Sequence, residues 1–445
     1  MSRVFTLKRR KIASDLSVSQ FTDLVLLNWL KSIHALALEF VALFALIMSL
    51  TALSMDAILP AFSSISSDLH IQNYQHTQWI ITVLILGMSF GDILFGPLSD
   101  AIGRKNSIFL GVGIFISGSI IVVFSTSLSM LLIGRAIQGI GLSGPKIVSR
   151  ALIRDLYCGA AMARILSYVM MVFILVPMLA PIFGQFIMSL SSWRWMFVVL
   201  IIQALMASIW LFCRQMETLP CTSRTPLDRS RLIKDAYFIL SRRDVIAYTL
   251  VSGCILGGLF LYLSTAQSLF QDVYQVGNKF TWYFALLAGF SGVSNFFNGC
   301  IVQKIGMMKC VVGALSVLLC SSFLLFAATW YYSGIPPFWL FMGLGAVMFS
   351  CLGMVFGNVN AMAMEPLGKI AGLGASMISS LSSFTAIVAA AFVGQFYHFS
   401  VTPLAGGFVL FTSLALLFLK VAKQGSTVSI NHAYWLEEIY RDKAK

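Results

Sequence analysis

The stretch GPLSDAIGRK, Gly96 to Lys105, separates two long apolar segments. The segment before it, Gln78 to Pro97, and the segment after it, Ser107 to Phe124, are each close to the ~20 mostly apolar residues that a bilayer-spanning helix needs. The charged residues of this region are confined to the short connection. The pattern therefore predicts two transmembrane helices joined by a tight turn.

The composition of the whole chain agrees with a membrane protein. Of the 445 residues, 58% are hydrophobic and 11% are charged, and the mean hydropathy is +0.88. An ordinary globular domain is about 45 to 50% apolar and about 25% charged. The net charge of +13 lies mostly in short connections, whereas a nucleic-acid binder gathers Lys and Arg on one exposed face. We therefore expect an all-α integral membrane protein without a nucleic-acid partner.

The eight cysteines are scattered, and none of them forms a Cys-x-x-Cys motif. We therefore expect neither a disulfide framework nor a metal site. They fit the role of small apolar packing residues.

The same window predicts about twelve transmembrane helices along the chain. These are Ala37 to Phe62, Gln78 to Pro97, Ser107 to Phe124, Ser129 to Ser149, Ile165 to Ser189, Trp195 to Cys213, Ile246 to Phe270, Thr281 to Val302, Met308 to Trp330, Pro337 to Met364, Leu373 to Phe396 and Pro403 to Val421.

The distribution of Lys and Arg predicts that both termini are cytoplasmic. With that orientation the outer connections carry only Arg194 and Lys279, and all other basic connections face inward. Six tryptophans then fall at the outer ends of the helices, as an interfacial aromatic belt would. They are Trp79, Trp193, Trp195, Trp282, Trp330 and Trp339.

The longest polar stretch between the predicted helices, Arg214 to Asp244, divides the chain into two halves of six helices. Paired six-helix repeats are typical of secondary transporters. The predicted organisation is a cytoplasmic N-terminal segment (1–35), a first six-helix bundle (36–213), a cytoplasmic linker (214–245), a second six-helix bundle (246–423) and a cytoplasmic tail (424–445).

An internal repeat supports this division. GCIVQKIGMMK, Gly299 to Lys309, follows the eighth predicted helix as GPLSDAIGRK follows the second. Gly306 aligns with Gly103, and glycine suits a tight turn because it takes positive φ freely. Gln303 replaces Asp100, so the second copy keeps the turn and loses most of the charge.

The fourth predicted helix contains R-x-x-Q-G at Arg135, Gln138 and Gly139. A formal G-x-G-x-x-G overlaps it, but no strand precedes these glycines, and Lys146 follows Pro145 without a Ser or Thr after it. A phosphate-binding loop is therefore excluded, and the glycines are better explained by close helix packing. No metal cluster or nucleophile triad is evident either, so we do not expect an enzyme.

The fifth predicted helix contains VPMLAPIFGQ, in which Pro177 and Pro181 remove backbone donors and bend the helix. Gly184 permits the close approach of a neighbouring helix. Ala180 precedes Pro181, and Gln185 follows Gly184.

These motifs resemble those of the major facilitator superfamily. GPLSDAIGRK, with Gly96, Asp100, Gly103, Arg104 and Lys105, is similar to its loop signature, and R-x-x-Q-G is similar to its fourth-helix signature. VPMLAPIFGQ, with Pro177, Ala180, Pro181 and Gly184, resembles the antiporter signature of the fifth helix in its form A-P-x-x-G-G, and Gln185 replaces the last glycine. Together with SMDAILPAF, RALIRDLY, SNFFN and NAMAM, it resembles the bicyclomycin-resistance (Bcr/CflA) branch of drug:proton antiporters. The resemblance implies the two-bundle fold, alternating access and export of small amphipathic compounds against a proton gradient.

Asp56 lies within a membrane segment, where a charged side chain costs roughly 2.5 to 3.5 kcal/mol. Arg135 lies at about the same distance from the outer end of its own helix, and the resemblance places both helices along the cavity of the first bundle. We therefore predict an ion pair in which Asp56 binds the proton and Arg135 sets its proton affinity. A fixed ion pair that only joins two helices is the alternative.

A second charge pair is predicted nearer the cytoplasm. Asp92 and Lys146 each lie about four or five residues from the inner end of a predicted helix. They would compensate each other near an inner gate, or Lys146 would extend to the interface. In the second half, Tyr262, Gln267, Asn295 and Asn358 are the candidate residues of a substrate cavity, although core packing also explains such residues.

The sequence thus predicts a proton-coupled exporter of the bacterial inner membrane, of the multidrug or antibiotic-resistance type. Its partners would be a small-molecule substrate, protons and the lipid bilayer, and we expect a monomer without cofactor or metal, energised by the proton gradient. A proton-coupled transporter of one endogenous metabolite is the first alternative. A membrane receptor or scaffold without transport is the second.

Overall fold

The computed structural model describes residues 39–71, 74–156, 176–220, 222, 224 and 227–443. In these residues every regular element is a helix. The predicted N-terminal segment 1–35 and the start of the fifth predicted helix lie outside the described residues.

The first half begins with a helix over residues 39–56, followed by the 3-10 helix η1 (Leu59–Ala61) and by α3 (Phe62–Asp68). Its further elements are η2 (Tyr74–Gln78), α4 (Trp79–Ile102), α5 (Arg104–Val123), α6 (Leu128–Leu156), an apolar helix Val176–Leu190 and α8 (Arg194–Arg214).

The linker contains a helix that the sequence analysis did not predict, α9 (Arg229–Ser241). The Asp228 side chain caps its N-terminus by accepting a hydrogen bond of 2.9 Å from the backbone amide of Ser230. The second half comprises α10 (Arg243–Ser268), the π-helix η4 (Leu269–Val273), η5 (Gly277–Lys279), α11 (Phe280–Ile305), α12 (Met307–Tyr331), α13 (Phe338–Met364), η6 (Glu365–Ile370), α14 (Ala371–Gly394) and α15 (Thr402–Lys443).

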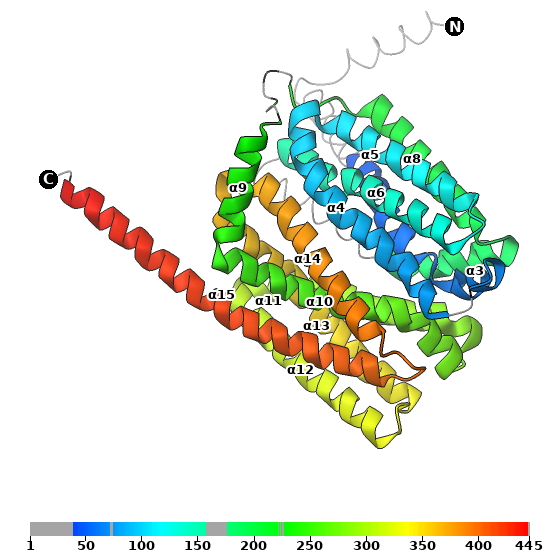
Figure 1. The fold of residues 1–445 in the computed structure, drawn as a ribbon. Helices are drawn as coiled ribbons and strands as arrows, with labels where there is room; N and C mark the ends of the chain where they lie inside the picture. Colours follow the sequence, from blue (N-terminus) through cyan, green and yellow to red (C-terminus); the bar gives the residue numbers. More distant parts are fainter. Residues whose placement is uncertain are drawn as a thin grey trace, which may run out of the picture.

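The helices form two groups that follow the two halves of the chain (Figure 1). In the first group α6 packs between α4 and α5, and α5 also contacts α8. In the second group α10 packs against α14 and α15, while α13 packs against α11 and α12. The main helix contact between the groups joins α4 to α14, so these two helices border the space between the halves.

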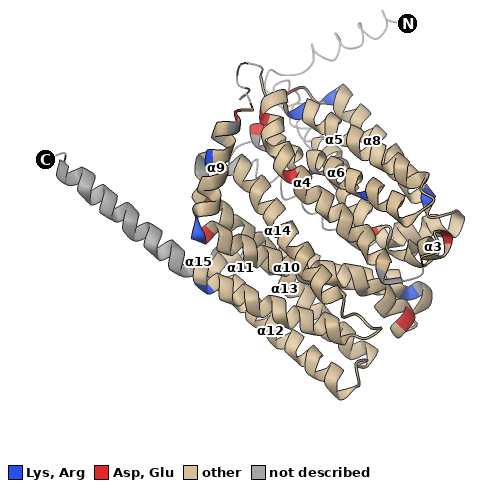
Figure 2. Cartoon of the chain, viewed as in Figure 1, with Lys and Arg blue, Asp and Glu red and all other residues tan. Residues whose placement is uncertain are grey.

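Nine of the described helical segments are long and apolar enough to cross a membrane. α6, α11 and Val176–Leu190 lie between these segments in chain order, where the sequence predicts the fourth, eighth and fifth transmembrane helices. Charged side chains gather at the helix ends and leave the helix bodies almost free of charge (Figure 2). The chain is a multi-pass membrane protein, while the count of twelve helices and the side of the termini stay predictions.

Five of the six tryptophans of the predicted outer belt have exposed side chains. Trp193 differs, because it is 2% exposed and its indole nitrogen donates a hydrogen bond to Asp68 at 3.1 Å. Arg194 binds the same carboxylate and lies 4.4 Å from the Trp193 ring. Trp193 thus fastens the start of α8 to α3 and does not face lipid.

Candidate transport site

Asp56 is the last residue of the first helix, at a break that the sequence analysis did not predict. We expected one continuous helix from Ala37 to Phe62, but the α-helix ends at residue 56 and a 3-10 turn with Pro60 follows. Proline lacks the amide hydrogen that would continue the helix. The Asp56 side chain is 5% exposed, and its Oδ1 has no hydrogen-bond partner among the described residues.

The predicted ion pair between Asp56 and Arg135 is not formed. The Arg135 guanidinium is fully buried and donates from Nε to the Ile80 carbonyl at 3.1 Å, from Nη2 to the Ser54 carbonyl at 2.9 Å and from Nη1 to Gln138 at 3.0 Å. These acceptors belong to the first half, and each of the three guanidinium nitrogens donates to one of them. Arg135 therefore joins the first helix, α4 and α6 instead of neutralising the carboxylate.

The rest of the fourth-helix signature strengthens this connection. Gln138 donates to Ser119 of α5 at 2.7 Å, which extends the network to a fourth helix. A Cβ added at Gly139 would lie 2.0 Å from the Leu84 carbonyl oxygen, so only glycine lets α6 approach α4 this closely. The signature thus acts as a unit that holds helices of the first half together.

Two predicted cavity residues on α10 face the first half. Tyr262 is 2% exposed and interacts electrostatically with Asp56, and its hydroxyl has no hydrogen-bond partner within residues that the structure describes. Gln267 is also buried, and its amide nitrogen lies 3.5 Å from the hydroxyl of Ser63 in α3. At the boundary of the two halves, Asp56, Tyr262 and Gln267 therefore each carry one buried polar atom that no other described residue binds.

The other two predicted cavity residues do not join this group. Asn358 of α13 exchanges hydrogen bonds of 2.9 and 3.3 Å with Asn298 of α11, which fastens two helices of the second half. Asn295 lies half-buried on α11. The Tyr262 ring packs against Phe284 at 5.6 Å and Phe349 at 4.8 Å, so an aromatic cluster backs this side of the boundary.

The predicted antiporter motif lies on the helix Val176–Leu190, beside Asp56. A Cβ added at Gly184 would lie 1.9 Å from the carbonyl oxygen of Ala57, so the helix contacts the chain at the residue after Asp56. Ala180 and Pro181 are buried on the same helix, and Pro177 is half-buried. Gln185, at the place of the expected glycine, accepts a hydrogen bond of 2.7 Å from Thr281 of α11 and so connects the two halves near their outer ends.

The structure brings together the second predicted pair, Asp92 and Lys146, with 2.6 Å between Nζ and Oδ2. The pair lies deeper than we expected, because α4 continues past Pro97 to Ile102 and α6 continues to Leu156. Each residue is thus ten positions, or roughly 15 Å, from the inner end of its helix.

A serine of the second half, which the sequence analysis did not single out, completes this group. Ser379 of α14 donates to Asp92 at 2.7 Å. Only the serine-rich run SMISSLSS within an apolar segment could have indicated it.

The loop signature is mostly helical, and its turn is a single residue. Gly103 separates α4 from α5 with φ of 102° and ψ of 158°, a conformation that essentially only glycine adopts. Arg104 pairs with Asp100 at 2.5 Å and with Asp155 of α6 at 2.8 Å. Gly96 lies within α4, where an added Cβ would lie 2.3 Å from the hydroxyl oxygen of Ser376 in α14.

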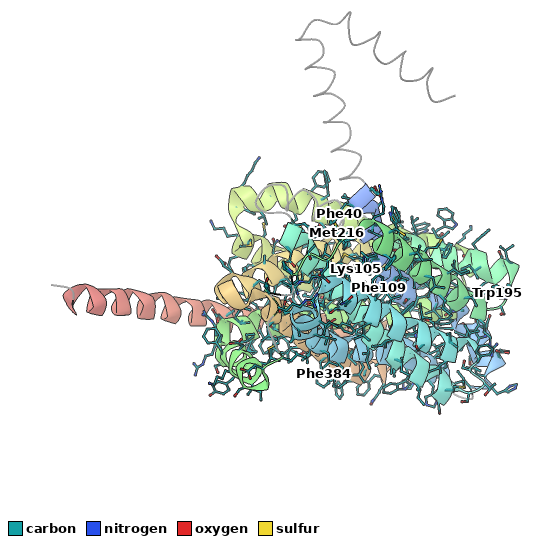
Figure 3. The ribbon with its side chains drawn as sticks, turned by 90° about the horizontal axis from the view of Figure 1, so that it is seen from above. Phe40, Lys105, Phe109, Trp195, Met216 and Phe384 are labelled. Carbon is teal, nitrogen blue, oxygen red and sulfur yellow. The ribbon has the colours of Figure 1, made fainter. Side chains whose placement is uncertain are left out.

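The linker contacts this turn through Glu217. The Glu217 carboxylate accepts hydrogen bonds from the backbone amides of Arg104 at 2.9 Å and Lys105 at 3.1 Å, and so caps the N-terminus of α5. The Lys105 ammonium donates to the carbonyl of Phe212 at 3.0 Å and lies 5.9 Å from the ring of Phe109 on α5 (Figure 3). No sequence signal pointed to Glu217, because the turn that places it lies in the linker.

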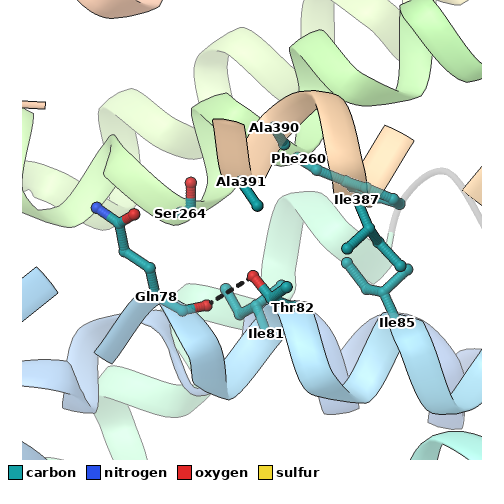
Figure 4. Close-up of a pocket in the computed structure, with 9 residues that line it drawn as sticks. All are labelled: Gln78, Ile81, Thr82, Ile85, Phe260, Ser264, Ile387, Ala390 and Ala391. Atoms are coloured by element: carbon teal, nitrogen blue, oxygen red, sulfur yellow. Dashed lines mark hydrogen bonds between the residues drawn. The ribbon is translucent and has the colours of Figure 1, made fainter. Parts of the chain in front are cut away.

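Two pockets lie at the boundary of the halves. Figure 4 shows the first, between Gln78, Ile81, Thr82 and Ile85 on one side and residues of α10 and α14 on the other. The second lies on the outer side and is lined by Ser63, Ser66, Ser67, His70, Ile71, Asp272 and Phe399. None of the four predicted cavity residues lines either pocket.

The chain thus has two membrane-spanning halves, buried polar groups at their boundary and a glycine turn between α4 and α5. Residues 44–390 match the model of the Major Facilitator Superfamily. The chain belongs to this superfamily. Its members are transporters rather than enzymes, as the sequence predicted.

Relatives within the superfamily include resistance proteins. The chain is 27% identical over 389 residues to a bicyclomycin resistance protein homolog of Haemophilus influenzae, which covers 84% of this chain and 96% of that protein. It is 28% identical to the uncharacterized MFS-type transporter YdgK of Bacillus subtilis (81% and 89% covered) and 23% identical to multidrug resistance protein D of Escherichia coli (76% and 84% covered). The resemblance to the bicyclomycin-resistance branch is thus confirmed at modest identity.

The fold agrees with solved transporters. A D-xylose-proton symporter superposes with a TM-score of 0.69 at 15% identity, covering 86% of this chain and 97% of the symporter. The human organic anion transporter MFSD10 gives a TM-score of 0.63 at 17% identity, with 87% and 99% covered. At these identities the likeness shows the major facilitator fold alone.

Proposed function

We propose that this superfamily member is a proton-coupled exporter of small amphipathic compounds, including antibiotics, in the bacterial inner membrane. The observation that carries the proposal is the buried Asp56 carboxylate at the boundary of the halves, whose Oδ1 has no hydrogen-bond partner in the part of the chain that the structure describes. An unpaired carboxylate in such surroundings is costly, and a bound proton removes its charge. The relatives named as resistance proteins support export of compounds of this class.

The surroundings of Asp56 fit a site where proton and substrate exclude each other. The helix ends at Asp56, so the carboxylate lies at the negative end of the helix dipole, which disfavours its charge. Gly184 brings the antiporter motif against the next residue, and Tyr262 presents a hydroxyl and an aromatic surface from the other half. An amphipathic substrate could meet the carboxylate and the ring cluster together.

Energy would come from the proton gradient and not from a cofactor. Arg135 would act indirectly, because its hydrogen bond to the Ser54 carbonyl fixes the chain two residues before Asp56. This replaces the predicted direct pairing. The chain would work as a monomer whose halves part alternately on each side.

The test is efflux of ethidium, a fluorescent amphipathic cation, from cells that express the full chain, with and without a protonophore. We expect protonophore-sensitive efflux by the wild type and, for Asp56→Asn, efflux no faster than in cells without the chain. Asp68→Asn is the matched control, since Asp68 is an outer carboxylate that pairs with Arg194. It should export as the wild type does.

Two results would redirect the proposal. Gradient-driven exchange retained in a well-expressed Asp56→Asn would exclude Asp56 as the proton site. No efflux of ethidium or other amphipathic compounds by the wild type would favour transport of one endogenous metabolite.

A further inference from the structure

The Asp92–Lys146 ion pair is the place where the second half reaches a buried charge of the first half. Asp92 is on α4 and Lys146 on α6, while Ser379 is on α14. The Ser379 hydroxyl donates to Asp92 Oδ2 at 2.7 Å and accepts from Lys146 Nζ at 3.4 Å. Asp92 is 0% exposed and Lys146 is 8% exposed, so the contact is sealed.

The depth of the three residues agrees with a contact inside the membrane on the cytoplasmic side. Asp92 and Lys146 are ten residues from the inner ends of their helices, and Ser379 is eight residues from the inner end of α14. These positions correspond to roughly 12 to 15 Å along the helix axes.

The next turn of the same two helices makes a second close contact. α4 and α14 run in opposite directions, so Gly96, four residues after Asp92, lies beside Ser376, three residues before Ser379. The 2.3 Å that would separate an added Gly96 Cβ from the Ser376 hydroxyl leaves no room for a side chain. Contact between the halves therefore continues from the ion pair toward the cytoplasm.

Positive charge from α6 faces the Asp92 carboxylate. Lys146 of α6 binds one oxygen, and Arg150, one turn further along α6, adds a second positive charge that interacts with Asp92. α14 contributes hydroxyls, Ser376 and Ser379, at this contact. Within the described residues, the Asp92 carboxylate is thus held by an ion pair of the first half and by one neutral hydroxyl of the second.

We propose that Ser379 and the Asp92–Lys146 pair form a reversible polar lock that holds the cytoplasmic side of the two halves closed. The division of the three groups between the halves is the basis. Both charges belong to the first half, so they stay together when α14 moves away. Separation of the halves then breaks hydrogen bonds to one neutral hydroxyl and leaves no buried charge unpaired.

An ion pair placed across the boundary would not serve in this way. Removing one partner of a buried pair leaves an uncompensated charge, which is strongly unfavourable. A gate that opens in every transport cycle needs a contact that is specific and weak. A hydroxyl on a buried carboxylate meets both needs, and Asp92 Oδ1, which has no partner among the described residues, can accept from water when the gate opens.

The test is hydrogen–deuterium exchange of the full chain in lipid nanodiscs, read by mass spectrometry on peptides from the inner parts of α4 and α14. For Ser379→Ala we expect exchange about two- to tenfold faster than in the wild type, because one hydrogen bond of the closed state is lost. Ser413→Ala is the matched control, since that exposed hydroxyl bonds only to the Val409 carbonyl of its own helix. It should exchange as the wild type does.

Exchanging the two charged residues of the pair tests the lock without leaving a buried charge unpaired. The double variant Asp92→Lys with Lys146→Asp keeps the ion pair, and the Ser379 hydroxyl can accept from the new ammonium. We expect wild-type protection in this variant and faster exchange again when Ser379→Ala is added. Wild-type exchange in folded Ser379→Ala would overturn the proposal. The measurement uses neither substrate nor gradient, so its outcome is separate from that of the efflux test.

Discussion

Arg135 shows how a charged residue can be found by sequence and still have a different role from the one predicted. Its place in a membrane helix and in the R-x-x-Q-G signature marked it as important. Its partners are two backbone carbonyls and Gln138, none of which a charge count can indicate. The ring of Phe197, 5.8 Å from the guanidinium carbon, covers the group further.

We expect both Arg135→Lys and Arg135→Met to lower the melting temperature of the purified protein. The guanidinium reaches three acceptors because its donors form a planar fork, and a lysine ammonium cannot reproduce this geometry. Each buried acceptor left without a partner costs about 1 to 3 kcal/mol. The measurement is thermal unfolding in detergent.

Arg214→Lys is the control for the Arg135 variants, because Arg214 pairs with Glu39 at a half-exposed site. A surface pair of this kind contributes about 0 to 1 kcal/mol. If Arg135→Lys unfolded at the wild-type temperature, the three hydrogen bonds would not be what stabilises the first half.

The pattern of apolar residues predicted where the membrane helices lie, because length and hydropathy alone decide which segments can cross a bilayer. The ends were less predictable. Pro60 ends the first α-helix near residue 56, whereas Pro97 lies inside α4 and does not end it. The same residue type has these two outcomes because neighbouring helices support α4 past its proline.

The two turn glycines allow a matched prediction for the loop between paired helices. Gly103 and Gly306 adopt φ of 102° and 83° with ψ near 155°, where a side chain costs about 1 to 3 kcal/mol. An added Cβ at Gly103 would also lie 2.5 Å from Glu217, while nothing lies within 4 Å at Gly306. We therefore expect Gly103→Ala to be the more destabilising.

Hydrogen exchange of the Arg104 and Lys105 amides distinguishes these effects. Gly103→Ala should displace Glu217 and speed their exchange, and Gly306→Ala should leave them as in the wild type. Equal loss of melting temperature in the two variants, with equal exchange at α5, would show that the contact with the linker adds nothing to the turn.

At the scale of the whole molecule, the halves touch on both sides of the membrane. Gln185 and Thr281 join them near the ends predicted to face outward, and Ser379 joins α14 to α4 nearer the ends predicted to face the cytoplasm. The sequence predicted two halves because the polar linker and the repeated glycine turn divide the chain. It did not predict which side chains meet across the boundary, because those contacts depend on how two separately packed groups of helices fit together.

The outer contact gives a test of alternating movement. We expect Gln185→Cys with Thr281→Cys, joined by a short bifunctional thiol reagent, to stop efflux, because substrate release to the outside needs these helices to part. Reduction of a cleavable reagent should restore efflux.

The single variants Gln185→Cys and Thr281→Cys, treated in the same way, control for native thiols such as the exposed Cys213 and Cys320. They should keep their efflux, since a reagent bound to one half leaves the other free to move. Undiminished efflux by fully cross-linked protein would mean that the outer ends of these helices do not separate during transport. The exit path would then lie elsewhere along the boundary, such as beside the pocket between α4 and α14.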